Sequence, residues 1–306
     1  MKLRECAPCF SDPLFLGEYI DDIVRYLYER EKSRIPFNNN SPQIEYRNLL
    51  VDFIQKIAEH RGFRRTTLFL GVYLLDIFMD NHSIALERLN IVSIVCLILA
   101  AKVEEMECTI PKLSEIKQLT NTECTVGDYI SLEALVLNFF NNHIIHPTVA
   151  TFLEIYIDAI ISEDDYKYYN THVSETTFKD FKSMKIAVTK TLFEFSNITL
   201  SCKSMSHERP SYVAASIVCA TRQAYSLEPI WNTNILYMTG YRYTDLDELI
   251  LRLLKYKKGE NDEVNDKRKS TPESGYISFN DSTSSDDDEI EDEEDMGDVA
   301  KRLKTE

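Results

Sequence analysis

The chain has 306 residues, of which 44% are hydrophobic, and a formal net charge of −16. This length allows two domains of ordinary size. The charge is uneven, because residues 259–306 hold 17 acidic and 6 basic side chains (−11), which leaves −5 of the −16 for the preceding residues. Neither part has the basic balance of a general polyanion binder, which argues against nucleic acid as the main ligand.

The seven cysteines do not form a metal-binding pattern. Cys6 and Cys9 make a single CxxC pair, without the second pair or nearby histidines that a structural zinc site needs. Cys96 and Cys219 lie in apolar helical stretches, where a free thiol acts as a small hydrophobe. Charged residues near the N-terminus interrupt any secretory signal, and no apolar run has the length of a membrane span. We therefore expect an intracellular protein with reduced thiols.

Helical apolar spacing runs through the first half of the chain. Ser11 or Asp12 can cap a first helix that reaches about Glu31, and a polar linker follows it. Five further helices are expected before residue 145: at about 42–60, 64–80 and 89–105, a short one from about Pro111, and one at 126–141 capped by Thr125.

The segment 89–105 is the most informative of these helices. It is apolar on every side for about three turns, which is typical of a helix surrounded by other helices. It is too short for a bilayer, which needs roughly 20 apolar residues. The run ends in Lys102, Glu104 and Glu105, so an ionisable residue lies at the end of a buried helix.

Pro147 restarts the pattern in the second half. Helices are expected at about 149–161, 181–195, 211–225 and 245–255, with a short one from about Pro229 and a polar interval at 163–171. The expected fold is all-α: an N-terminal helix and linker (1–40), two tandem five-helix domains (41–145 and 146–256) and an acidic tail (257–306).

The tail has no pattern that could form a core, so we expect it to be disordered. Thr271-Pro272 and the serines at 282, 284 and 285 resemble kinase substrates, and phosphorylation there would add charge to an already acidic segment. The basic clusters at 267–269 and 301–304 are compatible with nuclear import. A nuclear location is therefore favoured over a cytoplasmic one.

No catalytic constellation is present in the sequence. Phosphate-binding glycine loops, a GxSxG motif and an HExxH motif are all missing, and the six histidines lack metal-ligand spacing. We expect neither an enzyme nor a bound metal or cofactor.

Lys102 instead suggests a binding role. The expected helix at 126–141 carries one acid, Glu133, on an otherwise apolar face. If this helix packs antiparallel to the buried one, Glu133 reaches Lys102 at the end of the bundle. Such a pair could hold polar groups in place for a partner, or it could be a purely structural salt bridge.

These residues resemble the landmarks of the cyclin family. The first helix of that family carries a pattern that stands here as Arg47-Asn-Leu-Leu-Val-Asp52-Phe53, and the end of its third helix as Leu99-Ala-Ala-Lys102-Val-Glu104-Glu105. The fifth helix matches Glu133-Ala-Leu-Val-Leu137. The starts of the first and third helices of the second cyclin fold match Pro147-Thr-Val-Ala-Thr-Phe-Leu153 and Pro210-Ser-Tyr-Val-Ala-Ala215.

The resemblance implies a non-enzymatic activating subunit of a cyclin-dependent protein kinase in cell-cycle control. It would form a heterodimer with the kinase rather than a homo-oligomer, without nucleic acid or membrane as partner. The residues implied in kinase binding are Lys102, Glu133, Val103, Leu137, Tyr19 and Ile23. Arg47 and Asp52 are implied to be internal, with Asp52 accepting from Arg47 or from a helix end.

The family's substrate-docking patch would fall on Tyr46, Leu49, Leu50, Phe53 and Lys56. The last of these replaces an acid that is common in the family and would repel a basic docking peptide. Asparagine at position 142 and valine at position 103 replace aromatic residues, which would thin the kinase interface. Alternative readings are a cyclin-fold scaffold in transcription without a kinase, which needs a basic face, and a helical enzyme, which needs a pocket of perturbed titratable groups.

Overall fold

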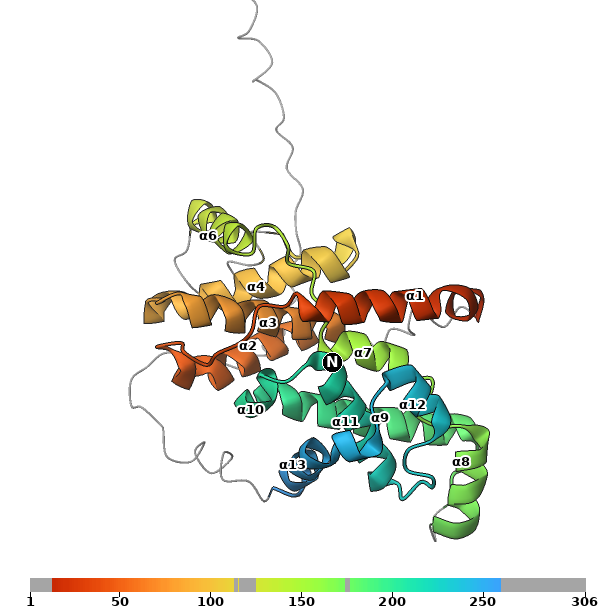
Figure 1. The fold of residues 1–306 in the computed structure, drawn as a ribbon. Helices are drawn as coiled ribbons and strands as arrows, with labels where there is room; N and C mark the ends of the chain where they lie inside the picture. The colour runs from red at the N-terminus through yellow and green to blue at the C-terminus, as the bar shows by residue number, and fades with distance from the viewer. Residues whose placement is uncertain (1–12, 113–114, 116–124, 174–176, 260–306) are drawn as a thin grey trace, which may run out of the picture. The chain divides into compact units, whose positions relative to one another are not determined.

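The computed structural model describes residues 13–112, 115, 125–173 and 177–259, with side chains described from residue 19 (Figure 1). Within these ranges all regular structure is helical. The longer helices are α1 (Pro13–Lys32), α2 (Arg47–Arg61), α3 (Arg65–Asn81), α4 (Leu89–Glu104), α6 (Val126–Phe139), α7 (Val149–Tyr156), α9 (Phe181–Ser201), α11 (Pro210–Ala224) and α13 (Asp247–Lys258). The shorter ones are α8 (Glu163–Tyr168), α10 (Lys203–Ser206) and α12 (Thr233–Thr239). None of the described helices is both long and apolar enough to cross a membrane.

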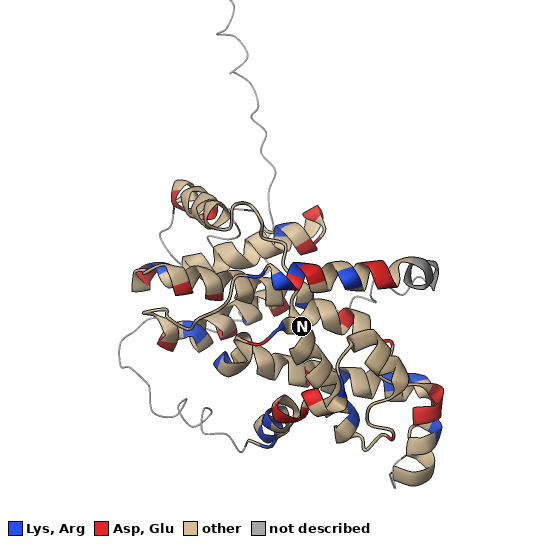
Figure 2. Ribbon diagram, viewed as in Figure 1, with Lys and Arg blue, Asp and Glu red and all other residues tan. Residues whose placement is uncertain are grey.

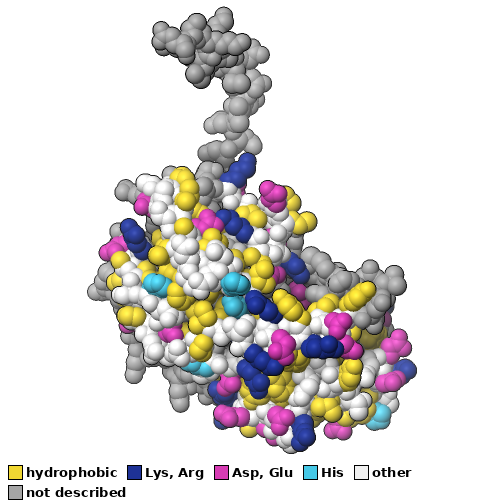
Figure 3. Space-filling view, turned by 45° about the horizontal axis from the view of Figure 1, so that its top comes forward, with side chains coloured by type: hydrophobic (Ala, Val, Ile, Leu, Met, Phe, Trp, Pro, Cys, Tyr) yellow, Lys and Arg dark blue, Asp and Glu magenta, His cyan; other side chains and the backbone are white. Residues whose placement is uncertain are grey.

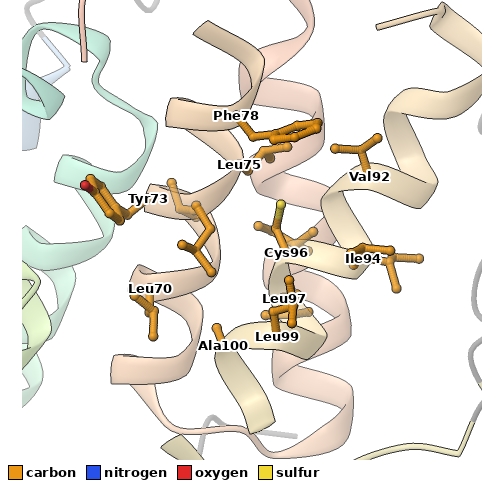
Figure 4. Packing of buried hydrophobic residues seen from close by; sticks show 14 of the residues in the cluster. Leu70, Tyr73, Leu75, Phe78, Val92, Ile94, Cys96, Leu97, Leu99 and Ala100 are labelled. Atoms are coloured by element: carbon orange, nitrogen blue, oxygen red, sulfur yellow. The ribbon is translucent and has the colours of Figure 1, made fainter. Parts of the chain in front are cut away.

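The first bundle is built around α4. Every residue from Ile91 to Ala101 is buried, as the all-round apolar pattern predicts. Helix α3 packs along it, and Figure 4 shows side chains of the two helices meeting in a shared core. The closest approach is at Gly71, where an added Cβ would lie 3.1 Å from the Cα of Leu97. Glycine therefore permits this backbone contact.

The second bundle repeats the plan around α11. Residues Val213 to Ala220 are buried, and α7, α9 and α13 pack against this helix. At its C-terminal end the fully buried Arg222 binds Asp165 of α8 with an Nη2–Oδ1 distance of 2.8 Å. Burial raises the pKa of Asp165, but the guanidinium and hydrogen bonds from Ser162 outweigh this and hold the pKa below its ordinary value.

Helix α1 packs on the second bundle, although it precedes the first in sequence. Ile20, Val24 and Leu27 contact the second core. The buried carboxylate of Glu31 accepts 2.7 Å hydrogen bonds from the backbone N–H and the hydroxyl of Ser211, in the first turn of α11. An anion at a helix N-terminus is favoured by the unpaired N–H groups there, so Glu31 fixes the end of α1.

The structure differs from the sequence-based expectation in three segments. The interval 163–171, predicted only as polar, contains α8 and the start of a π-helical turn (Tyr169–Val173), and a capping box of Ser162 and Asp165 begins α8. Helix α9 continues to Ser201 instead of ending at about 195, and α7 ends at Tyr156 instead of about 161. The body of the short helix expected from Pro111, the CxxC pair and almost all of the acidic tail lie outside the described residues.

Candidate functional site

The C-terminal end of α4 and the middle of α6 meet at a single ion pair. Lys102 Nζ donates to the Glu133 carboxylate, which confirms that the two residues pair. The Lys102 side chain is 44% exposed and that of Glu133 16% exposed, and Figure 2 shows the charges at this end of an otherwise uncharged α4. Thr125 caps α6 with a reciprocal capping box and so sets where the helix begins. Solvent-accessible ion pairs contribute only about 0–1 kcal/mol to the free energy of unfolding. The Lys102–Glu133 pair is therefore not explained by fold stability alone.

The two acids that follow Lys102 have separate surroundings. Glu105 accepts 2.6 Å hydrogen bonds from the Arg64 N–H and the Thr67 hydroxyl, and so caps the start of α3. Arg64 also binds Glu154 of α7 at 3.0 Å. Burial and the neighbouring Glu104 raise the pKa of Glu154 against the opposing effect of Arg64. This network holds the C-terminal end of α4, and with it Lys102, against both bundles.

Exposed apolar side chains lie on or next to the two helices that carry the ion pair. Val126, Ile130 and Leu135 of α6 are 41%, 53% and 49% exposed, and Met106 after α4 is 65% exposed. Figure 3 shows hydrophobic side chains exposed among charged ones on the face that carries α1 and α6. Only Tyr129 and Val136 of α6 are buried, so most of this apolar helix is uncovered. A polar pair within uncovered apolar surface is typical of a protein interface.

The residues predicted from sequence cover only part of this apolar surface. Val103 and Leu137 are half-buried and pack against the first core, so they lie beneath the exposed apolar residues and contribute less to the surface. The exposed residues of α6 were missed, although their signal was available: α6 is apolar on more faces than one core contact can cover.

The two residues of α1 that were predicted to bind the kinase differ in exposure. Tyr19 is 51% exposed, but Ile23 packs against the second core. Tyr26, which the sequence analysis did not select, is 58% exposed and lies seven residues after Tyr19, on the same side of the helix. Nearby, Arg30 Nη2 donates to the Ile145 carbonyl at 3.0 Å, which ties α1 to the segment between the bundles.

Arg47 is internal, but Asp52 is not its partner. The Arg47 side chain is 1% exposed and binds Asp76 of α3 through two bonds, Nε–Oδ1 at 2.7 Å and Nη2–Oδ2 at 2.8 Å. It also donates to the Leu200 carbonyl and the Ser206 hydroxyl, each at 3.0 Å. Asp52 is exposed, because it lies on the outer side of α2 five residues after Arg47. The prediction that Asp52 is buried was wrong.

Comparisons with known proteins match this arrangement. The family model "Cyclin, N-terminal domain" matches residues 22–145, and "Cyclin, C-terminal domain" matches residues 147–280. The chain belongs to the cyclin family. The resemblance inferred from the sequence motifs and the two tandem all-α cyclin domains are thereby confirmed.

This cyclin is similar to cyclin-J proteins over most of its length. It is 31% identical to Cyclin-J of Xenopus laevis over 78% of this chain, and 29% identical to human Cyclin-J over 86%. It spans 62% of the Xenopus protein and 68% of the human one. A viral cyclin from herpesvirus saimiri has the same fold, with a TM-score of 0.59 at 14% identity over 78% of this chain and 97% of the viral one.

The substrate-docking patch expected on α2 is smaller in this cyclin than the motif suggests. Leu50 is 3% exposed and Phe53 is 9% exposed, so both belong to the first core and their assignment to the patch was wrong. Leu49 is 53% exposed, Tyr46 is half-buried and Lys56 is exposed. Since helical positions 50 and 53 share the inward side of α2, only the other three residues remain available to a ligand.

Proposed function

We propose that this cyclin is the activating regulatory subunit of a cyclin-dependent protein kinase. The observation that carries the proposal is the Lys102–Glu133 pair, held at the end of a buried helix, together with the exposed apolar residues of α6, among which Ile130 lies one turn before Glu133. Membership of the chain in the cyclin family supports the same role. Tyr19 and Tyr26 of α1 would extend the contact surface, since α1 is fixed to the second bundle through Glu31.

The mechanism would be selection of one kinase conformation. Lys102 offers N–H donors and Glu133 offers acceptor oxygens to backbone groups beside the mobile helix of the kinase. Docking would hold that helix inward, where the kinase completes its own Lys–Glu ion pair and orders its activation loop. Moving a kinase from 1% to 99% active requires about 5.5 kcal/mol of differential binding. Burial of the apolar residues on α6 would supply part of this, at about 25 cal/mol per Å².

The test is calorimetric binding of the full chain to purified cyclin-dependent kinases, beside a Lys102→Ala/Glu133→Ala variant. We expect binding in the native chain and at least about a 30-fold loss in the variant, because hot-spot groups typically contribute about 2 kcal/mol or more. The matched control is Lys167→Ala/Asp164→Ala, which removes an exposed ion pair on α8. Equal binding by the native chain and both variants would place the interface elsewhere. Absence of binding to every kinase would refute the proposal and favour a scaffold.

The regulated step and the location are extensions of this proposal. A role in cell-cycle control is supported by the similarity to cyclins such as "S-phase entry cyclin-6" of Saccharomyces cerevisiae, which is 27% identical over 75% of this chain. Nuclear import is supported by the basic clusters at 267–269 and 301–304, which lie outside the described residues. Replacing both clusters by alanine should move a fluorescent fusion from nucleus to cytoplasm.

A further inference from the structure

One face of α9 is basic and carries an exposed apolar residue at its centre. Lys182 and Lys190 are exposed, and Ile186 between them is 60% exposed. The half-buried Phe193 continues the same face, since successive steps of four, four and three residues stay on one side of a helix. The Arg65 guanidinium lies over the Phe193 ring, 4.0 Å from its centroid. We call these five residues the α9 face.

The acids around the α9 face are already engaged. Asp158 binds Lys185 at 3.0 Å, and Asp180 accepts the Ser183 N–H as the cap of α9. Glu194 lies 3.5 Å from Lys257, and Glu154 is bound by Arg64, the residue before α3.

By contrast, within the part of the chain that the structure describes, Lys182 and Lys190 have no ion-pair partner. A local excess of positive charge therefore surrounds an exposed isoleucine, in a chain whose net charge is −16.

The face also continues toward the candidate kinase site without being part of it. Arg65 starts α3, and its backbone neighbour Arg64 donates to Glu105 at the end of α4. Arg65 Nη1 in turn donates to Asn197 of α9 at 2.9 Å. A segment bound along α9 would therefore lie beside a docked partner while using different residues. The inference does not depend on kinase binding.

The distance between the two apolar residues of the α9 face indicates which kind of peptide could contact both. Ile186 and Phe193 are seven residues apart, which is about 10 Å along a helix. In a peptide with the polyproline II conformation, residues three positions apart lie on the same side and about 9 Å apart, because this helix has three residues per turn. We propose that the α9 face docks an acidic peptide of a partner protein in this conformation, with two large apolar residues three positions apart and acids on either side. The apolar pair would contact Ile186 and Phe193, while the acids would face Lys182, Lys190 and Arg65.

The experiment is fluorescence anisotropy with the full chain and a labelled peptide, Glu-Asp-Leu-Glu-Asp-Phe-Asp-Glu. We expect saturable binding that weakens as salt is raised, because exposed charges are screened. Lys182→Glu/Lys190→Glu should weaken binding about tenfold, and Ile186→Asp should do the same. Lys182→Arg/Lys190→Arg should retain it. A peptide of the same composition with Leu and Phe adjacent should bind more weakly, since one of them then misses its contact.

The control is Arg88→Glu/Lys112→Glu, which makes the same charge change at two other exposed sites. A loss of binding equal to that of the α9 double variant would show non-specific charge attraction and overturn the proposal. So would a salt-dependent dimer of the chain that the α9 double variant abolishes, because a second copy would then occupy the face. Binding that appears only after the acids at 286–295 are replaced by amides would assign the face to that segment instead.

Discussion

The buried pair between Arg47 and Asp76 gives the sharpest stability prediction. Arg47→Met keeps much of the side-chain length but removes all four hydrogen bonds of the guanidinium. It leaves the Asp76 carboxylate, whose side chain is 6% exposed, without its cation. Breaking a buried pair by removing one partner typically costs 3–5 kcal/mol. We therefore expect a loss of about 4 kcal/mol and a Tm lower by roughly 10 °C.

The assay is thermal and urea unfolding followed by circular dichroism, with three variants. Asp52→Asn is the matched control, because it alters an exposed carboxylate of the same helix and should change stability by less than about 0.5 kcal/mol. Arg47→Met/Asp76→Leu should regain much of the loss, since no unpaired charge stays buried. Equal losses for Arg47→Met and Asp52→Asn, or a double variant no more stable than Arg47→Met alone, would refute the assignment of Asp76 as the partner.

Three further predictions concern other contacts. Gly71→Ala should destabilise the chain by about 1–2 kcal/mol in thermal unfolding, because the new Cβ meets the Leu97 backbone at 3.1 Å. Glu31→Gln should weaken the contact with Ser211 and increase hydrogen exchange in α1, while exchange in α4 stays unchanged. Burial, with nearby arginines, lowers the pKa of His146 to about 4. Since the unfolded value is about 6.5, protonation favours unfolding, so stability should be full above about pH 6.5 and fall toward pH 4, and His146→Gln should flatten this decline.

The Lys102–Glu133 pair could be predicted from sequence because helical periodicity nearly determines it. An all-round apolar helix must be central, its single cation must lie at the end, and the neighbouring helix offers a single acid on its apolar face. Asp76 could not be assigned to Arg47 by the same means, because Asp76 lies inside α3 and not at the end of a buried helix, so its place in the chain points to no particular partner. A signal was nevertheless present. Asp76 is a lone acid within the apolar stretch of α3, and a buried carboxylate needs a cation or several donors.

The surface assignments failed for a different reason. Periodicity tells which residues share a side of a helix, but not which side another element covers. Leu50 and Phe53 were assigned to a surface patch although they face the core, and Ile23, assigned to an interface, is half-buried against the second core. These placements depend on the tertiary position of α2 and α1. The start of α8 could have been found, because Ser162 followed by Asp165 is a capping-box spacing.

The attachment of α1 has a consequence for synthesis of the chain. Glu31 leaves the ribosome 180 residues before its partner Ser211. At 5–20 residues per second, this interval lasts about 10–40 s. Throughout it, Ile20, Ile23, Val24 and Leu27 have no surface to cover them, because the bundle they contact has yet to be made. The newly made helix thus has an uncovered apolar side, which the chain can bury only after most of its length has been translated.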